Sequence, residues 1–257
     1  MSHDPVSESL NSPPLPRLYT EFAKYWTLVS APEDYAQEAE HWINAVRSRL
    51  GPGRHRALEL GVGGGNNMSH MTREFEFVAA DASADMIEQA RSLNPEVELH
   101  VGDMRTIRLG KTFDAVLIHD AISYMLTEDD LRAVFATARA HLRSGGVLVT
   151  APDWYRETFR DSDTSASTRR INDVELTMFE YSYDTDPTDT TYDTIMWLLI
   201  RKAGGSPQVE RDHHRLGLFP LATWEGLMVE AGFGFGKDRY DVHEDGREAY
   251  LLVGVNR

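Results

Sequence analysis

The chain contains no cysteine and no long apolar run. The first absence excludes disulfide bonds and thiolate metal sites. The second excludes a membrane-spanning helix, which needs ~20 consecutive apolar residues, and the first residues show no apolar signal segment either. We therefore expect a soluble protein of the cytoplasm that does not bind membranes.

Basic residues are also scarce. The chain has 26 Lys and Arg against 41 Asp and Glu, which gives a formal net charge of −15. This balance disfavours nonspecific binding to nucleic acids or anionic membranes and favours neutral or cationic small molecules as partners. The 257 residues, 41% of them hydrophobic and 10% aromatic, suffice for one large α/β domain with an insertion or for two small domains.

A glycine-rich loop at residues 61–65 follows the apolar run 57–60 and precedes a helical pattern. This order predicts a strand, a tight turn and a helix, where bare backbone can approach a ligand. A dinucleotide motif would need a third glycine where this chain has Asn66, and a phosphate-binding loop would end in a lysine that is absent here. Glu59, an acid inside the strand, instead suits the sulfonium and amino groups of S-adenosylmethionine.

Strands and helices alternate around this loop. Asp81, Asp103 and His119-Asp120 each follow an expected strand, and ligands bind at the carboxyl ends of strands in open α/β sheets. Asp81 can hold the ribose hydroxyls of an adenosine there, or can cap the next helix. The pattern predicts a doubly wound, Rossmann-like parallel sheet with helices on both faces. The expected strands are residues 57–60, 77–80, 97–101, 113–118 and 147–150, and helices are expected at 84–93 and 131–142.

We divide the chain into five parts. The composition of residues 1–17 predicts a disordered tail. The pattern of residues 18–50 predicts two helices whose aromatic side chains pack in the core or form a lid. Residues 51–152 form the cofactor-binding core. Residues 153–222 contain extended runs at about residues 173–183, 192–202 and 208–215, separated by turn clusters, which indicates an antiparallel meander. Residues 223–257 predict a helix and two strands that complete the core sheet.

The ordered motifs resemble those of the class I S-adenosylmethionine-dependent methyltransferases. Four stations carry the resemblance: the acid with its glycine loop, Asp81, Gly102-Asp103-Met104, and Gly145-Gly146. Three further segments resemble the sugar N,N-dimethyltransferases of macrolide biosynthesis: Asp34-Tyr35-Ala36, Arg108-Leu109-Gly110 and Glu157-Thr158-Phe159. Two positions depart from that group, because Gly64-Gly65-Asn66 replaces its Gly-Thr-Gly and the fourth strand runs into His119-Asp120.

The resemblance implies S-adenosyl-L-methionine as cofactor, a seven-stranded mostly parallel sheet, and an antiparallel substrate-binding insertion after the fifth strand. It implies a methyltransferase acting on a small-molecule acceptor, amine or hydroxyl. We expect the cofactor to contact Glu59, Gly61, Gly63, Asp81, Ala82, Met86, Asp103, Met104 and His119. We expect the acceptor to contact Tyr25, Asp120, Trp154, Tyr155 and Trp197.

Methyl transfer from a sulfonium is an in-line displacement that depends on aligning the reactants. An amine then needs little more than loss of a proton, whereas a hydroxyl needs a base. His119 can be that base or a structural contact, and Tyr19 and Tyr25 of the lid are the other catalytic candidates. Whether nitrogen or oxygen is methylated stays open at this point.

The glycine loop is compatible with two other functions. These are a nicotinamide-dependent oxidoreductase and a noncatalytic module that binds the cofactor. The adjacent His213 and His214 face opposite sides of a strand, so with Asp212 we interpret them as a solvated strand edge, and we expect no metal site. A homodimer is one assembly that the sequence allows.

Overall fold

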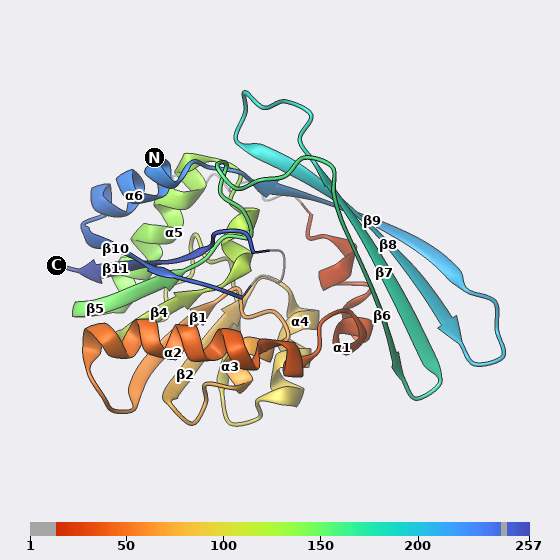
Figure 1. Cartoon of the computed structure of the whole chain (residues 1–257). Coiled ribbons are helices and arrows are strands. Elements are labelled where there is room, and N and C mark those ends of the chain that lie inside the picture. The colour runs from red at the N-terminus through yellow and green to blue at the C-terminus, as the bar shows by residue number, and fades with distance from the viewer. Residues whose placement is uncertain (1–13, 243–245) are drawn as a thin grey trace, which may run out of the picture.

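The computed structural model describes residues 14–242 and 246–257. Its core is a seven-stranded sheet in the order β10-β11-β5-β4-β1-β2-β3 (Figure 1). The strands β1 to β5 pair in parallel, and β11 runs antiparallel to β5 and β10. The predicted mostly parallel sheet is therefore confirmed. Its strands are β1 (His55–Leu60), β2 (Phe75–Asp81), β3 (Glu98–Val101), β4 (Phe113–Ile118), β5 (Leu142–Thr150), β10 (Phe233–Arg239) and β11 (Tyr250–Asn256).

Helices cover both faces of this sheet because successive residues of the central strands point to opposite sides and both sides are apolar. Ala57 and Leu117 face one helical layer, in which Trp42 is fully buried. Leu58 and Val116 face the other. The first layer contains α2 (Ala36–Leu50), α3 (Asn66–Ser69) and α4 (Ala84–Leu93), and the second contains α5 (Glu128–His141) and α6 (Leu221–Glu230).

The insertion after β5 is a second sheet, which leans out from one end of the core (Figure 1). Four antiparallel strands form it in the order β6-β7-β8-β9. Its inner face packs against the N-terminal segment, where Leu18, Phe22 and Leu28 meet Leu176 and Leu198. The antiparallel insertion is confirmed. Its strands are β6 (Asp163–Ile171), β7 (Val174–Tyr183), β8 (Thr191–Lys202) and β9 (Gln208–Gly217).

Three local features differ from the sequence prediction. Strand β6 was not predicted, because this edge strand is mostly polar and exposed and so lacks an alternating apolar pattern. The first lid helix is instead two 3₁₀ turns, η1 (Arg17–Tyr19) and η2 (Ala23–Tyr25), followed by the single turn α1 (Trp26–Val29). Strand β5 starts at Leu142, since Gly145 adopts a positive φ of 74° and the pairing with β4 slips there instead of ending.

No helix in the described parts of the chain is long and apolar enough to cross a membrane. Two further 3₁₀ turns approach the carboxyl end of the core sheet. They are η3 (Pro32–Tyr35), which leads into α2, and η4 (Asp120–Tyr124), which follows β4. Together with η1 they surround the edge at which the sequence places its candidate site.

Candidate active site

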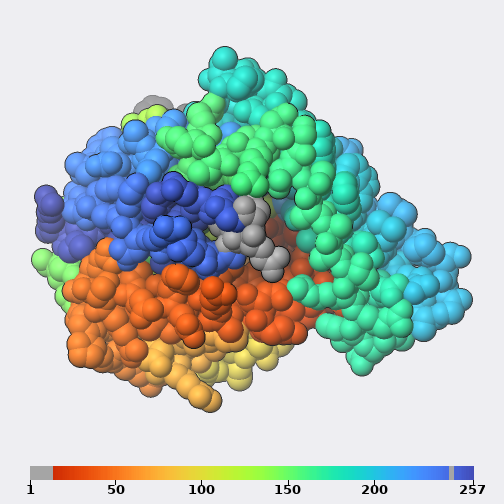
Figure 2. Space-filling view, viewed as in Figure 1, coloured from red at the N-terminus to blue at the C-terminus, as the bar shows by residue number. Residues whose placement is uncertain are grey.

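A cavity of about 660 Å³ lies at the carboxyl ends of β1, β2 and β4. Its floor includes Glu59, Asp81 and His119, and its cover includes Tyr19 and Trp26 from the N-terminal segment. Figure 2 shows the recess between the insertion and the core, with N-terminal residues in red inside it. The volume lies within the range of about 300–1,000 Å³ that is typical of small-molecule sites.

The glycine loop closes the floor of this cavity. Gly61 and Gly63 have positive φ angles of 73° and 54°, which a side chain would strain. The Gly63 amide donates to the Asp81 carboxylate at 2.8 Å, and the Ser83 amide donates to its other oxygen at 2.8 Å. Burial raises the pKa of Asp81, and these amides oppose that rise. The loop therefore holds the Asp81 carboxylate in one orientation, with lone pairs left for a ligand.

The N-terminal cover lies directly on the loop. A Cβ atom added at Gly64 would lie 2.1 Å from Nε1 of Trp26, so only glycine allows the indole to pack there. Asn66 holds the segment that carries Trp26 against the loop, because its side-chain amide donates to the carbonyl of Ser30, directly after α1, at 3.0 Å. The sequence suggested an aromatic lid but did not identify Trp26 as its contact with the loop.

Three side chains that line the cavity have buried polar atoms without hydrogen-bond partners among the described residues. These atoms are Oε2 of Glu59, Nε1 of Trp26, and both side-chain polar atoms of Asn67. Buried polar groups are otherwise almost always hydrogen-bonded, so such a cluster indicates a missing ligand. A carboxylate oxygen suits an ammonium group, and indole and amide N–H groups suit a carboxylate. The set fits the amino acid end of S-adenosylmethionine.

Glu59 is the most perturbed acid of this cluster. Its side chain is 3% exposed, and burial raises its pKa to about 8, against which the nearby His119 has a smaller lowering effect. Glu59 is therefore mostly protonated at neutral pH while no cation is bound.

The opposite end of the cavity contains Asp103 and Met104. Arg105 forms an ion pair with Asp103 at 2.6 Å and with Asp130 at 2.8 Å, so a cation that also lines the cavity fixes the Asp103 carboxylate. Asp103 and Met104 both line the cavity. A carboxylate acceptor next to a thioether suits the amino group and the ring of an adenine.

His119 is bound on both ring nitrogens. Its Nε2 lies 2.8 Å from Glu38 and 3.4 Å from the Tyr240 hydroxyl, and its Nδ1 lies 3.2 Å from Asp120. Burial lowers the pKa of His119, but the charges and hydrogen bonds of its partners outweigh that effect and raise the pKa well above its ordinary value. A carboxylate on each ring nitrogen therefore favours the imidazolium form of His119. A ring that already carries both protons cannot accept another, which argues against His119 as a general base.

The pKa values of two acids near His119, Asp120 and Asp153, are shifted in opposite directions. Burial raises the pKa of Asp120, but the charge and hydrogen bond of His119 outweigh it, so the pKa lies below its ordinary value. Its side chain is about half exposed, at 54%, and it lines the cavity. Burial and the charge of Asp120 raise the pKa of Asp153 to about 7. Asp120 is thus the fixed negative charge at this end of the cavity.

A chain of hydrogen bonds connects the cavity to the insertion. The hydroxyls of Tyr19 and Tyr124 are 2.8 Å apart, and the Tyr124 hydroxyl lies 2.6 Å from Nδ1 of His214. Nε2 of His214 lies 3.0 Å from Asp212. Asp212 and His214 are both buried, so their interpretation as a solvated strand edge is wrong. Residues two apart on a strand share a face, and this signal was available in the sequence.

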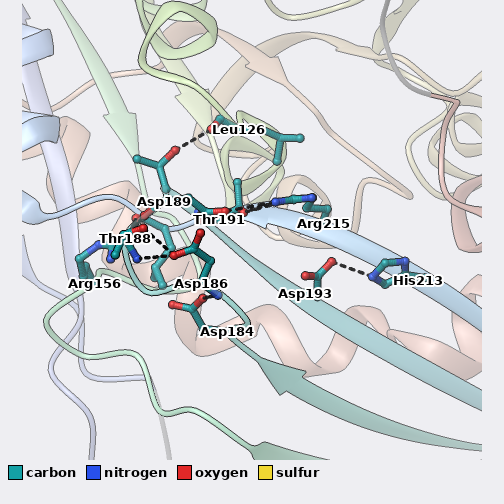
Figure 3. Close-up of polar contacts among 12 residues, drawn as sticks. Leu126, Arg156, Asp184, Asp186, Thr188, Asp189, Thr191, Asp193, His213 and Arg215 are labelled. Carbon is teal, nitrogen blue, oxygen red and sulfur yellow. Dashed lines mark hydrogen bonds and ion pairs between the residues drawn. The ribbon is translucent and has the colours of Figure 1, made fainter.

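His213 points away from this chain of bonds, as its position in the strand predicts. Its Nε2 lies 2.7 Å from Asp193, and Arg215 on the same side lies 2.9 Å from the Thr191 hydroxyl and 3.3 Å from Asp189 (Figure 3). His213 and Arg215 line the outer rim of the cavity. No group of three potential metal ligands occurs within residues 14–242 and 246–257.

Most predicted site residues lie around the cavity, and five do not line it. Met86 is buried behind the loop, with its Cε atom 3.8 Å from a Cβ position at Gly63. Tyr155 donates to the Tyr250 carbonyl in the core, and Trp154 packs against Phe159 under the Arg247 guanidinium. Tyr25 joins the cluster under the insertion, and Trp197 lies on its outer face beside Phe179. The residues that line it are Tyr19, Glu59, Gly61, Gly63, Asp81, Ala82, Asp103, Met104, His119 and Asp120.

A protein-family model described as a methyltransferase domain matches residues 57–146. These residues contain the glycine loop and the acids of the cavity, so the fold and the site define a methyltransferase. The chain is 34% identical to the dTDP-3-amino-3,4,6-trideoxy-alpha-D-glucopyranose N,N-dimethyltransferase of Streptomyces venezuelae, over 87% of this chain and 92% of that protein.

Two solved structures are similar to this one. The structure of Streptomyces venezuelae DesVI has a TM-score of 0.79 and 30% identity, over 92% of this chain and 97% of that chain. The S-adenosylmethionine-bound structure of CalS10, an amino pentose methyltransferase of Micromonospora echinaspora, has a TM-score of 0.75 and 27% identity, over 87% and 92% of the two chains.

The chain therefore belongs to the class I S-adenosylmethionine-dependent methyltransferases, in the family that contains the sugar N,N-dimethyltransferases. The predicted enzyme class, the cofactor and the transfer of a methyl group to a small molecule are confirmed. The nicotinamide oxidoreductase and the noncatalytic module are not supported.

Proposed function

We propose that the protein methylates the amino group of a nucleotide-linked aminosugar, and that it can add two methyl groups in turn. The similar Streptomyces venezuelae enzyme is named for a dTDP-linked 3-aminosugar, and the similarity covers the insertion as well as the core. The observation that carries the choice of nitrogen is the state of His119. Because a carboxylate lies on each of its ring nitrogens, His119 does not serve as a base for a hydroxyl.

The cofactor supplies, when bound, an electrophilic methyl group on a sulfonium. We propose that Asp81 orients the ribose, that Asp103 and Met104 hold the adenine, and that Glu59 binds the ammonium end. Gly61, Gly63, Ala82 and Met86 shape the loop and the helix start around it. His119 lines the floor of this site. It fixes Asp120, and its positive charge acts to lower the pKa values of Glu59 and Asp120.

The acceptor side of the proposal rests on Tyr19 and Asp120. Both line the cavity, and an ionised carboxylate with a phenol oxygen can bind an amine through its N–H groups. Tyr25, Trp154, Tyr155 and Trp197 stay predictions as acceptor contacts. We do not include the last two in the proposed site, because Tyr155 bonds within the core and Trp197 lies on the outer sheet face.

The test is a direct assay with two matched acceptors. The protein, S-adenosylmethionine and dTDP-3-amino-3,4,6-trideoxy-α-D-glucopyranose should give mono- and dimethylated products in mass spectrometry. The same nucleotide sugar with a hydroxyl in place of the amine should give none. Methylation of the hydroxyl sugar with no reaction of the amine would contradict the proposal.

We also propose that two chains associate through the outer face of the insertion. Phe179, Leu199 and Val209 are 38%, 37% and 64% exposed there, and Trp197 packs against Phe179. An exposed apolar face of this kind favours a protein partner. Light scattering should show a dimer for the natural chain and a monomer for Trp197→Lys; equal masses would contradict this. The cytoplasmic location stays a prediction.

A further inference from the structure

The hydrogen-bonded chain from Asp212 to Tyr19 joins three segments that are far apart in the sequence. Tyr19 belongs to η1, Tyr124 ends η4, and His214 with Asp212 lies on β9. Its three links measure 2.8, 2.6 and 3.0 Å from the cavity outward, so each is a normal hydrogen bond. Tyr19 and Tyr124 line the cavity, whereas His214 is 1% exposed.

The direction of each bond follows from Asp212. The Leu18 amide donates to Asp212 Oδ2 at 2.6 Å, and the His213 amide donates to Oδ1 at 3.0 Å. Burial raises the pKa of Asp212, but His214 and these amides outweigh it, so the pKa lies below its ordinary value and the group is a carboxylate. A carboxylate only accepts hydrogen bonds, and therefore Nε2 of His214 carries a proton and donates it.

This fixes the remaining bonds when the ring is neutral. Nδ1 of His214 then has a lone pair and accepts the Tyr124 hydroxyl, and the Tyr124 oxygen accepts the Tyr19 hydroxyl. The Tyr19 oxygen is left with a lone pair toward the cavity. Tyr19 is therefore an acceptor for an N–H group of the ligand, and not a donor, as long as His214 is neutral.

We propose that this chain of bonds is a proton relay that removes the proton from the acceptor's ammonium group and places it on His214. The proton leaves the ammonium nitrogen for the Tyr19 oxygen as the Tyr19 proton moves to Tyr124 and the Tyr124 proton moves to Nδ1 of His214. The N–H electron pair stays on nitrogen as the nucleophile. His214 becomes an imidazolium paired with Asp212, and every hydroxyl is again protonated.

The chemistry of the parts suits these roles. Burial raises the pKa of both tyrosines well above the ordinary value, so neither keeps a negative charge and both pass the proton on. The Asp212 carboxylate lies 3.0 Å from Nε2 of His214, where it stabilises the positive charge that the ring takes up. Only Tyr19 and Tyr124 reach the cavity. His214 and Asp212 act through them and are positioning residues. The inference rests on the proposed amine acceptor.

The groups that face the relay are known from the structure. Asp81, Asp120 and Asp153 act on Tyr19 from the core, and Asp120 and Asp153 act on Tyr124. His214 faces Tyr19 and Tyr124 through its ring and Asp212 through its nitrogen. The β8 residue opposite it is the uncharged Thr194. All these acids remain in the variants below, so any change in pH profile comes from the relay.

The experiment measures kcat against pH with saturating S-adenosylmethionine and dTDP-3-amino-3,4,6-trideoxy-α-D-glucopyranose. Tyr124→Phe keeps the ring and removes the link, and His214→Gln keeps a donor to Asp212 but cannot take a proton. At neutral pH we expect each variant to lose on the order of 10²- to 10⁴-fold in kcat, a typical contribution of a positioned proton acceptor. The loss should vanish at a pH above the pKa of the acceptor's ammonium, because the amine then arrives unprotonated.

Two matched controls remove the same groups elsewhere. Tyr250→Phe removes a phenol at the protein surface, and His100→Gln removes a histidine from β3; both should keep the natural profile. A purely structural role would lower kcat by one factor at every pH, and that result would overturn the relay, as would natural kcat at neutral pH in both variants. If the unaltered enzyme does not methylate this aminosugar at all, the proposed function fails instead.

Discussion

Glu59 provides the sharpest test of the cofactor site, because its charge opposes folding and favours binding. Its pKa in the folded protein is about 8, against an ordinary value of 4.5. A group whose pKa is raised by folding stabilises the fold fully below the ordinary value, and that stability is lost as the pH rises through the folded value. The apo protein should therefore lose stability between about pH 4.5 and 8.

The magnitude follows from this difference. One pKa unit corresponds to ~1.36 kcal/mol, so an ionisable Glu59 costs the apo protein about 1 kcal/mol at pH 5, about 3 kcal/mol at pH 7 and about 5 kcal/mol above pH 8. Glu59→Gln removes the charge and keeps the shape. At pH 7 it should raise the free energy of unfolding by up to about 3 kcal/mol, which corresponds to roughly 6–12 °C in Tm for a chain of this size.

The assay is thermal unfolding of both proteins at several pH values, with and without S-adenosylmethionine. Without cofactor the variant should be more stable, by a margin that grows with pH. With cofactor the difference in Tm should narrow or reverse, because the variant has no carboxylate to bind the ammonium group of the ligand. The same coupling means that binding to the natural protein should release a proton near pH 7. An equal Tm at pH 5 and pH 8 would refute the assignment of a buried charge, and equal cofactor affinity would refute its role in binding.

Three further substitutions test other parts of the site. Asp81→Ala should weaken S-adenosylmethionine binding by roughly 10- to 100-fold, the worth of a charged hydrogen bond; calorimetry showing unchanged affinity would remove Asp81 from the site. His119→Gln should lower Tm, since losing one partner of a buried ion pair costs about 3–5 kcal/mol, and should raise the acceptor's KM more than it lowers kcat; a loss of kcat at neutral pH that disappears at high pH, with the acceptor's KM unchanged, would restore His119 as the base. Gly64→Ala should displace Trp26 and weaken cofactor binding, whereas Gly226→Ala on α6, where a Cβ meets nothing within 4 Å, should not; unaltered binding in both would contradict the proposed cover.

The core was predictable because its signals are local. Residues 57–60 of β1 and 115–118 of β4 are buried and, apart from Glu59, apolar, and the glycine loop follows β1 directly as Asp81 ends β2. Strand β6 escaped prediction because an exposed edge strand needs no apolar pattern. The sequence does not place Tyr155 and Trp197 for a related reason: an aromatic in a meander fits the core, the cavity or an outer face equally well, and only the register of the sheet decides.

The roles of individual polar residues depended on contacts that the sequence does not show. His119 follows β4 as predicted, but the carboxylate that holds its Nε2 comes from Glu38, 81 residues earlier. That single contact changes a candidate base into a fixed cation. His214 was given a solvated position, yet η1 and η4 cover it, and neither packing partner could be inferred from β9 alone. The sequence identifies the polar residues of the site. Their protonation states depend on contacts between distant segments, which only the folded structure shows.

The Asp120 carboxylate that binds the acceptor and the relay that takes its proton depend on each other. An alkylamine in neutral solution is mostly an ammonium ion, and the ionised Asp120 in a chain of net charge −15 favours that charged form in the cavity. The ammonium nitrogen has no lone pair, so the form that binds best cannot accept a methyl group. A site that attracts the cation therefore needs a group that takes its proton after binding. His119 cannot serve, because Glu38 and Asp120 keep it protonated. The Tyr19–Tyr124–His214 relay ends on a ring whose Nδ1 is free to accept a proton, and it leads away from Asp120, so deprotonation does not neutralise the carboxylate that holds the acceptor.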